Sequence, residues 1–374
     1  MKKLVRHLIV FSCVGGSAWA APFLAIGDNA ELFVTGSAGI RYDDNILLAP
    51  DSGKKDDIIT QFVPGIDLEF GKDSLVKGSF TAQETLNSYN KHSYLNTQLA
   101  AVAFKSNYDN GKLKLGTNAS YTQLDQNTYG ANGTNLRRDQ TGAGVDGEYS
   151  ISDKTSIGSG FDYSAIHYLK NTGVDEWDYS VPVNVYYSIT PKVDLSSGVT
   201  YTRTDLDNGT HYDTYYYNVG ARGEFTPKLS GHFSVGYNDR NGTGVGAQDN
   251  SGVGVQSGLV YVYSEKTQLT LDASRDFGNG SSGASQEQTS VALGARTDIA
   301  ADWQANAGLT YRLIDYKTTG SPSADYYEAT VGATYVINSN LSVNGSYLFR
   351  GNKSDIAGQG FTDNVVALSI SGRY

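Results

Sequence analysis

Several features common in proteins of this length are missing from the sequence. Of 374 residues, one is cysteine, one is methionine and seven are proline, and only 18% are charged. Both Met1 and Cys13 lie within the first twenty residues. After Ala20 no stretch approaches the roughly 18 consecutive apolar residues that a helical membrane span needs. The remainder therefore has no disulfide framework, no thiol chemistry and no helical span.

The first twenty residues predict a cleavable secretory signal. A basic start (Lys2, Lys3, Arg6) precedes a short apolar run that ends at Ala18-Trp19-Ala20. The run is too short to cross a bilayer as a helix, so we expect cleavage after Ala20. The expected organisation is a signal peptide over 1–20, a short periplasmic segment over 21–30 and a barrel over 31–374.

Loss of the signal leaves 26 Lys and Arg residues against 39 Asp and Glu residues, a formal charge of −13. Nucleic acid is a poor partner for such a chain, because nucleic-acid binding needs a basic surface.

What the sequence does contain, from Glu31 onward, is a period of two. Between Trp177 and Ile189 the odd positions are Trp, Tyr, Val, Val, Val, Tyr and Ile, and the even positions include Asp, Ser, Asn and Ser. Side chains alternate between the two faces of a strand, so one face is apolar and the other polar. The pattern predicts eighteen strands: 31–42, 58–71, 75–87, 94–106, 112–124, 139–151, 155–168, 177–189, 193–204, 215–226, 229–240, 253–264, 267–277, 287–299, 303–315, 326–337, 341–350 and 363–374.

The connections between these segments alternate strictly between short turns and longer loops. Short ones include Asp109-Asn110-Gly111 and Thr190-Pro191-Lys192, and the longest are 43–57 and 125–138. An even number of strands with short periplasmic turns and longer outer loops is typical of bacterial outer-membrane barrels. We therefore predict an all-β fold, a transmembrane antiparallel up-and-down β-barrel of about 18 strands, exported to the bacterial outer membrane.

Aromatic residues and the chain end agree with this prediction. Trp and Tyr cluster at segment ends, where amphipathic rings favour the headgroup level. The last segment ends on Tyr374 and resembles the C-terminal signal that the insertion machinery of outer-membrane barrels recognises. Outer-membrane lipid and lipopolysaccharide are the other expected partners.

A barrel of this size leaves an aqueous lumen. Placing the polar face inward predicts lumen-facing charges at Arg41, Asp67, Glu69, Glu148, Arg222, Glu224, Arg240, Arg296, Arg312, Glu328 and Arg350. Both signs are present, so strong ion selectivity is not expected, and paired wall charges are the simplest interpretation. Four tyrosines fall on the same face and are candidates for stacking on sugar rings, although interface-level tyrosine is common in barrels: Tyr168, Tyr186, Tyr216 and Tyr326.

Catalysis and metal binding have little support. Four histidines follow the signal. His167 is expected to face outward near a strand end, and His92 and His211 lie in or beside outer loops. His232 faces inward but has no serine and acid at an informative spacing. We expect no enzymatic activity, no cofactor and no metal. An acidic group in the first long loop (Asp43, Asp44, Asp56, Asp57) is a weak calcium candidate, since Asp is also an ordinary turn former.

One segment resembles a known family. Residues 39–46 read Gly-Ile-Arg-Tyr-Asp-Asp-Asn-Ile, and residues 57–60 and 63–68 follow as Asp-Ile-Ile-Thr and Val-Pro-Gly-Ile-Asp-Leu. This is similar to the opening of the putative β-barrel porin 2 family, over roughly 40 residues. The resemblance implies a pore for export of a secreted polysaccharide, with a periplasmic polysaccharide-export protein as a further partner. Two alternatives stay open: a general or solute-specific uptake porin, which usually has a long loop folded into the lumen, and a structural or adhesive barrel acting through its outer loops.

Overall fold

The structure, a computed structural model, describes residues 22–126, 135–169, 173–244, 246–318 and 320–374. The predicted signal peptide, its cleavage site and Cys13 lie outside this part of the chain. No helix within these ranges is long and apolar enough to cross a membrane.

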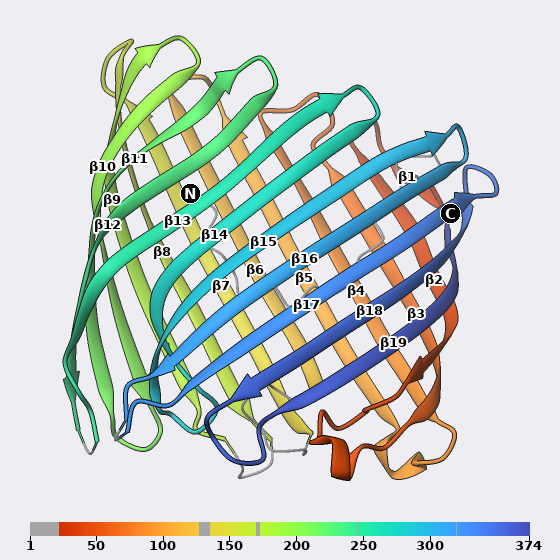
Figure 1. Ribbon diagram of the computed structural model, residues 1–374. Coiled ribbons are helices and arrows are strands. Elements are labelled where there is room, and N and C mark those ends of the chain that lie inside the picture. Colours follow the sequence, from red (N-terminus) through yellow and green to blue (C-terminus); the bar gives the residue numbers. More distant parts are fainter. Residues whose placement is uncertain (1–21, 127–134, 170–172, 245, 319) are drawn as a thin grey trace.

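Eighteen antiparallel strands, β2 to β19, form one closed sheet in which each strand pairs with its neighbour in sequence (Figure 1). β19 returns to pair with β2, from Val365 opposite Asp43 to Arg373 opposite Thr35, so no edge is left open. Closure matters because an unpaired strand edge has no hydrogen-bonding partner in lipid. The predicted fold class is confirmed.

The strands are long and nearly uniform. They are Ala30–Asp43 (β2), Asp57–Phe70 (β3), Val76–Tyr89 (β4), Thr97–Asp109 (β5), Leu113–Gln126 (β6), Leu136–Ser150 (β7), Thr155–Tyr168 (β8), Glu176–Thr190 (β9), Val193–Leu206 (β10), His211–Thr226 (β11), Leu229–Thr243 (β12), Asn250–Ser264 (β13), Thr267–Asn279 (β14), Ser285–Ala300 (β15), Trp303–Tyr316 (β16), Ser323–Val336 (β17), Leu341–Ser354 (β18) and Phe361–Arg373 (β19). A short strand, Leu24–Ile26 (β1), pairs with the start of β2, and two 3-10 turns lie at Asp51–Gly53 (η1) and Ser93–Leu95 (η2).

The predicted strands are shorter than the observed ones, mainly at the end of the barrel that carries the longer connections. This end is called the loop end below. β11 begins at His211, four residues before its predicted start, and β13 begins at Asn250. β1 lies in a segment for which no strand is predicted. Alternation fades where both faces of a strand are wet, so the pattern identifies only the portion that crosses the apolar layer.

Short turns close the opposite end, called the turn end. In the β5–β6 turn Gly111 has a φ of 86°, a conformation that glycine adopts without steric cost. Its N–H donates to the carboxylate of Asp109 at 2.7 Å, and the N–H of Lys112 donates to the Asn110 side chain at 3.0 Å. The side chains of the turn thus take up backbone groups that leave the ladder.

Candidate functional site: the barrel lumen

The two faces of the sheet differ in chemistry, as β9 shows. Val181, Val183 and Val185 are exposed on one face, whereas Ser180 and Asn184 on the other face are buried. Large apolar side chains are exposed in the same way on every side of the barrel, and this surface fits a lipid environment. The opposite face lines the lumen.

The strand registers place all eleven predicted charges and all four predicted tyrosines on the lumen face with Ser180 and Asn184. Their surroundings differ. Glu224 lies at the turn end and forms an ion pair with Lys192. Arg350 forms an ion pair with Asp363 at 2.6 Å, and Arg296 donates to Gln304 at 3.0 Å.

One group of lumen charges joins strands that are not neighbours. Arg222 on β11 donates to both carboxylate oxygens of Glu148 on β7, at 2.8 and 2.6 Å, and to Asp194 on β10 at 3.0 Å. Its guanidinium also stacks on the ring of Tyr186, 3.5 Å from the centroid. Side chains from β7 and β11 meet only across the concave side of the wall, which turns at the left edge of Figure 1. Tyr186, a candidate for stacking on sugar rings, is therefore already stacked on an arginine of the wall.

At the loop end, the connection between β2 and β3 folds into the mouth of the barrel. Leu48 packs against Tyr326 of β17 and Phe361 of β19, and Ile46 packs against Ile59 and Tyr89 on the other side. A loop of this length is sufficient to reach inward, because it needs to cross only the strands next to β2.

Asn45, which is fully buried, fixes the path of this loop. Its side-chain amide donates to the carbonyl oxygens of Ala49 at 2.8 Å and Thr362 at 2.9 Å, and its side-chain oxygen accepts from the N–H of Ala49 at 2.9 Å. Leu48 has a φ of 47°, a strained conformation for a leucine. The packing of its side chain compensates for that strain. Sequence reasoning missed both residues, although Asn45 belongs to the Tyr-Asp-Asp-Asn segment.

The acidic residues around this loop serve as hydrogen-bond acceptors. Asp57, fully buried, accepts from the backbone N–H groups of Ile58, Asn90, Lys91 and His92 at 2.8 to 3.0 Å. Asp56 pairs with Lys91 at 2.6 Å, and this ion pair lowers the pKa of the Asp56 carboxyl. Within the described ranges no group of three or more metal-ligating side chains comes together.

A second contact covers the opposite side of the mouth. The N–H of Val174, before β9, donates to the carbonyl of Ser281, after β14, at 2.9 Å. Below it Asn279 donates to Glu176 at 3.2 Å and accepts from Arg240 at 2.7 Å. The Val174–Ser281 and Asn279–Glu176 bonds bridge over the strands β10 to β13 that lie between, and Arg240 joins the bridge from β12. Arg240 also stacks on Tyr212, 3.9 Å from the ring centroid, so the bridge is anchored to the wall.

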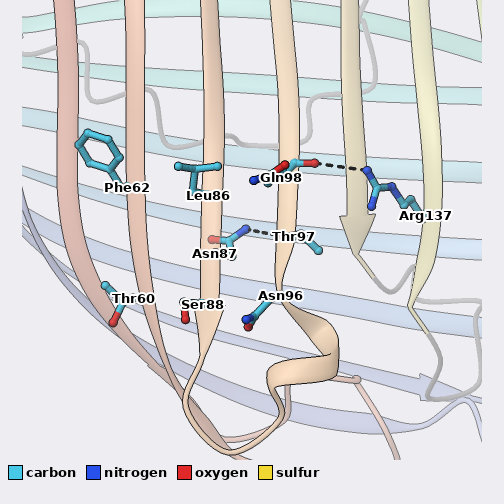
Figure 2. A pocket seen from close by; sticks show the side chains of 9 residues that line it. All are labelled: Thr60, Phe62, Leu86, Asn87, Ser88, Asn96, Thr97, Gln98 and Arg137. Atoms are coloured by element: carbon cyan, nitrogen blue, oxygen red, sulfur yellow. Dashed lines mark hydrogen bonds between the residues drawn. The ribbon is translucent and has the colours of Figure 1, made fainter.

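A cavity of about 570 Å³ lies at the outer wall (Figure 2). Phe62 and Leu86 lie opposite each other on the lipid-facing register of β3 and β4. Arg137 of β7 reaches across β6 and donates to the backbone carbonyl of Gln98 at 3.3 Å, a bond that Figure 2 shows. Pairing of β5 with β6 stops at Ala101, so Arg137 supplies a partner to an unpaired strand end. The lining of this cavity also includes Asn87 and Thr97, which lie on the lumen-facing register, so the cavity belongs to this strand end of the wall.

Three histidines lie at the loop end and contact carboxylates. His92 contacts Asp57 at 2.9 Å, His211 contacts Asp205 at 2.8 Å, and His167 contacts Asp175. The fourth, His232, lies opposite Arg222 and Gly258 in the register of the lumen face.

Solved structures with a similar arrangement include the outer membrane protein OpdK. OpdK of Pseudomonas aeruginosa is 12% identical, with a TM-score of 0.48 over 92% of this chain and 99% of that one. OccK9 (OpdG) of the same organism is 11% identical, with a TM-score of 0.49 over 92% and 98%. OccAB4 of Acinetobacter baumannii is 11% identical, with a TM-score of 0.47 over 92% and 98%. At these identities nothing about their solutes transfers to this chain.

No curated protein matches the sequence. The family model described as putative beta-barrel porin 2 matches residues 167–374, more than half of the chain. The match confirms the family suggested by the sequence, although residues 39–68, which carry the resemblance noted there, lie outside the matched part. The chain therefore belongs to the putative beta-barrel porin 2 family.

Proposed function

We propose that this barrel is a passive uptake porin for small polar solutes, the alternative that the sequence leaves open. The observation that carries the proposal is the loop between β2 and β3, whose Leu48 packs against Tyr326 and Phe361 inside the mouth. Export of a folded or hydrated polysaccharide favours a wide lumen without a constricting loop. A mouth narrowed from two sides suits solutes of limited size better.

The lumen wall is consistent with diffusion of solutes through water. Positively and negatively charged side chains both line it. In one group, Arg222 pairs with Glu148 and with Asp194, so the net charge of the three residues is −1. Passage through a pore requires binding that is weak enough for release. Charges that are paired within the wall attract a charged solute less strongly than a ring of charges of a single sign does.

Permeability of proteoliposomes tests the proposal. The folded barrel is reconstituted, and influx is compared for arabinose, glucose, maltose and a dextran too large for a porin. We expect influx to fall steeply with solute size and dextran to stay outside. In a matched variant in which Gly-Ser-Gly replaces residues 46–54, influx of maltose should rise relative to arabinose.

Two results would contradict uptake through a narrowed lumen. One is a folded barrel, verified by its β-type circular dichroism, that passes none of the sugars. The other is a barrel that passes dextran as readily as arabinose. This second result would favour polysaccharide export over uptake of small solutes.

A further inference from the structure

A hollow in the lumen wall lies between β14 and β17, the strands whose Asn279 and Tyr326 contribute to the two narrowed sides of the mouth. It has a volume of about 170 Å³ and is lined by inward side chains of four neighbouring strands, β14 to β17. Two adjacent rows of the register form it. One row is Asp272, Ala292, Thr310 and Glu328, and the other is Thr270, Gly294, Gly308 and Thr330.

The hollow exists because the residues at its centre are small. Ala292, Gly294 and Gly308 have little or no side chain to fill the space, and two threonine hydroxyls lie next to the glycines. A Cβ atom added at Gly294 would lie 2.4 Å from Oγ1 of Thr270, and one added at Gly308 would lie 2.7 Å from Oγ1 of Thr330. Thr310 contributes a third hydroxyl between them. Each hydroxyl both donates and accepts hydrogen bonds.

Carboxylates stand at the two ends of the row. Asp272 lies on β14 and Glu328 lies on β17, and within the described ranges neither forms an ion pair. One oxygen of Glu328 accepts a hydrogen bond from the hydroxyl of Tyr326 at 2.5 Å, and the carboxylate keeps its negative charge. The lining contains no arginine, lysine or histidine. Arg350, opposite Glu328 in the register, is bonded to Asp363 at 2.6 Å. The hollow therefore presents negative charge together with hydroxyl groups.

We propose that this hollow is a subsite for a small cationic solute that bears hydroxyl groups, an amino sugar being the simplest example. The carboxylates attract the ammonium group, and the three threonines exchange hydrogen bonds with the hydroxyls. A volume of about 170 Å³ corresponds to roughly five or six water molecules in the liquid, a size that suits one sugar ring. The hollow opens to the lumen and does not enclose the solute, so binding is weak and release is rapid.

The subsite rests on the proposed function, because it needs solutes that pass through the lumen. Its test compares influx of radiolabelled glucosamine and N-acetylglucosamine into proteoliposomes at a pH where the amine of glucosamine is protonated. The two sugars share all their hydroxyls and differ only at the nitrogen, where N-acetylation removes the charge and adds an acetyl group. For the native barrel we expect faster influx of glucosamine at low concentration.

The variants isolate the hollow from the lumen as a whole. In Asp272→Asn/Glu328→Gln the preference for glucosamine should fall by up to about fivefold, the factor that an exposed charge contact provides. Asp146→Asn is the matched control, since Asp146 is an inward carboxylate on β7, across the barrel from β16. It should leave the preference unchanged.

The outcomes separate the two proposals. If neither sugar enters the native proteoliposomes, the porin function itself fails. If both enter but the double variant keeps the native preference, the subsite is wrong while the porin function stands. An equal loss in Asp146→Asn would also overturn the subsite, because it would assign the preference to the lumen charge in general. The single variants Asp272→Asn and Glu328→Gln replace the double variant if that chain does not fold.

Discussion

Arg222 and Glu148 are 74 residues apart in sequence and three strands lie between them, yet two hydrogen bonds of 2.8 and 2.6 Å join their side chains. The pair ties two parts of the wall together on the lumen side, with Asp194 and the ring of Tyr186 completing the contacts of the guanidinium. It is a stabilising device of the barrel and also narrows the lumen locally.

Arg222→Ala should therefore lower stability and widen the lumen together. The substitution leaves the carboxylates of Glu148 and Asp194, which are partly exposed, without their partner. We expect a loss of about 1–2 kcal/mol in the free energy of unfolding, less than for a fully buried pair. Urea unfolding in detergent and single-channel conductance measure the two effects. The control is Arg296→Ala, which removes one bond to Gln304 and should change neither. Equal stability of the Arg222 variant and the native barrel would contradict the structural role.

Leu48 offers a prediction whose sign depends on backbone strain. Leu48→Ala removes the packing against Tyr326 and Phe361 and keeps a Cβ atom in the left-handed conformation. Leu48→Gly removes the same packing but relieves the strain, which costs about 1–2 kcal/mol. We expect Leu48→Gly to be less destabilised than Leu48→Ala by about 1 kcal/mol in urea unfolding. The reverse order would show that the loop does not hold Leu48 in this conformation. Both variants should show more frequent fluctuations of channel current.

Asp355 supplies a prediction about pH at the loop end. The carboxylate accepts hydrogen bonds from the backbone N–H of Ser323 at 2.9 Å and from its hydroxyl at 2.8 Å. These bonds lower the pKa of Asp355 below its ordinary value. Its contribution to stability is therefore present above the ordinary pKa of an aspartate and is lost as the pH falls through the lowered pKa. Carbon-13 NMR of the Asp carboxyls measures the titration.

Ser323→Ala is the matched variant for this titration. It removes the hydroxyl bond and keeps the backbone bond, so the pKa of Asp355 should move back toward its ordinary value without reaching it. An unchanged pKa in Ser323→Ala would show that the hydroxyl does not contact the carboxylate in solution.

Much of the barrel could be predicted from the sequence because its cause is local. In β9, for example, the valines at 181, 183 and 185 alternate with polar residues such as Ser180 and Asn184, and this alternation indicates which face is apolar. No distant residue is needed to interpret the pattern. The turns are equally local, since Gly111 and Asn110 specify their own backbone. The same alternation assigns Arg222 and Glu148 to one face, but it gives no distance between them.

What the sequence alone determined is the number of strands, their antiparallel order and the face on which each side chain lies, because these follow from a period of two and the length of each connection. What only the tertiary structure decided is which inward side chains meet: Leu48 with Tyr326, Arg222 with Glu148, and the two rows that leave a hollow between Asp272 and Glu328. Those contacts depend on the curvature of the closed wall and on the register between strands. Both are properties of the whole cylinder and appear in no single segment.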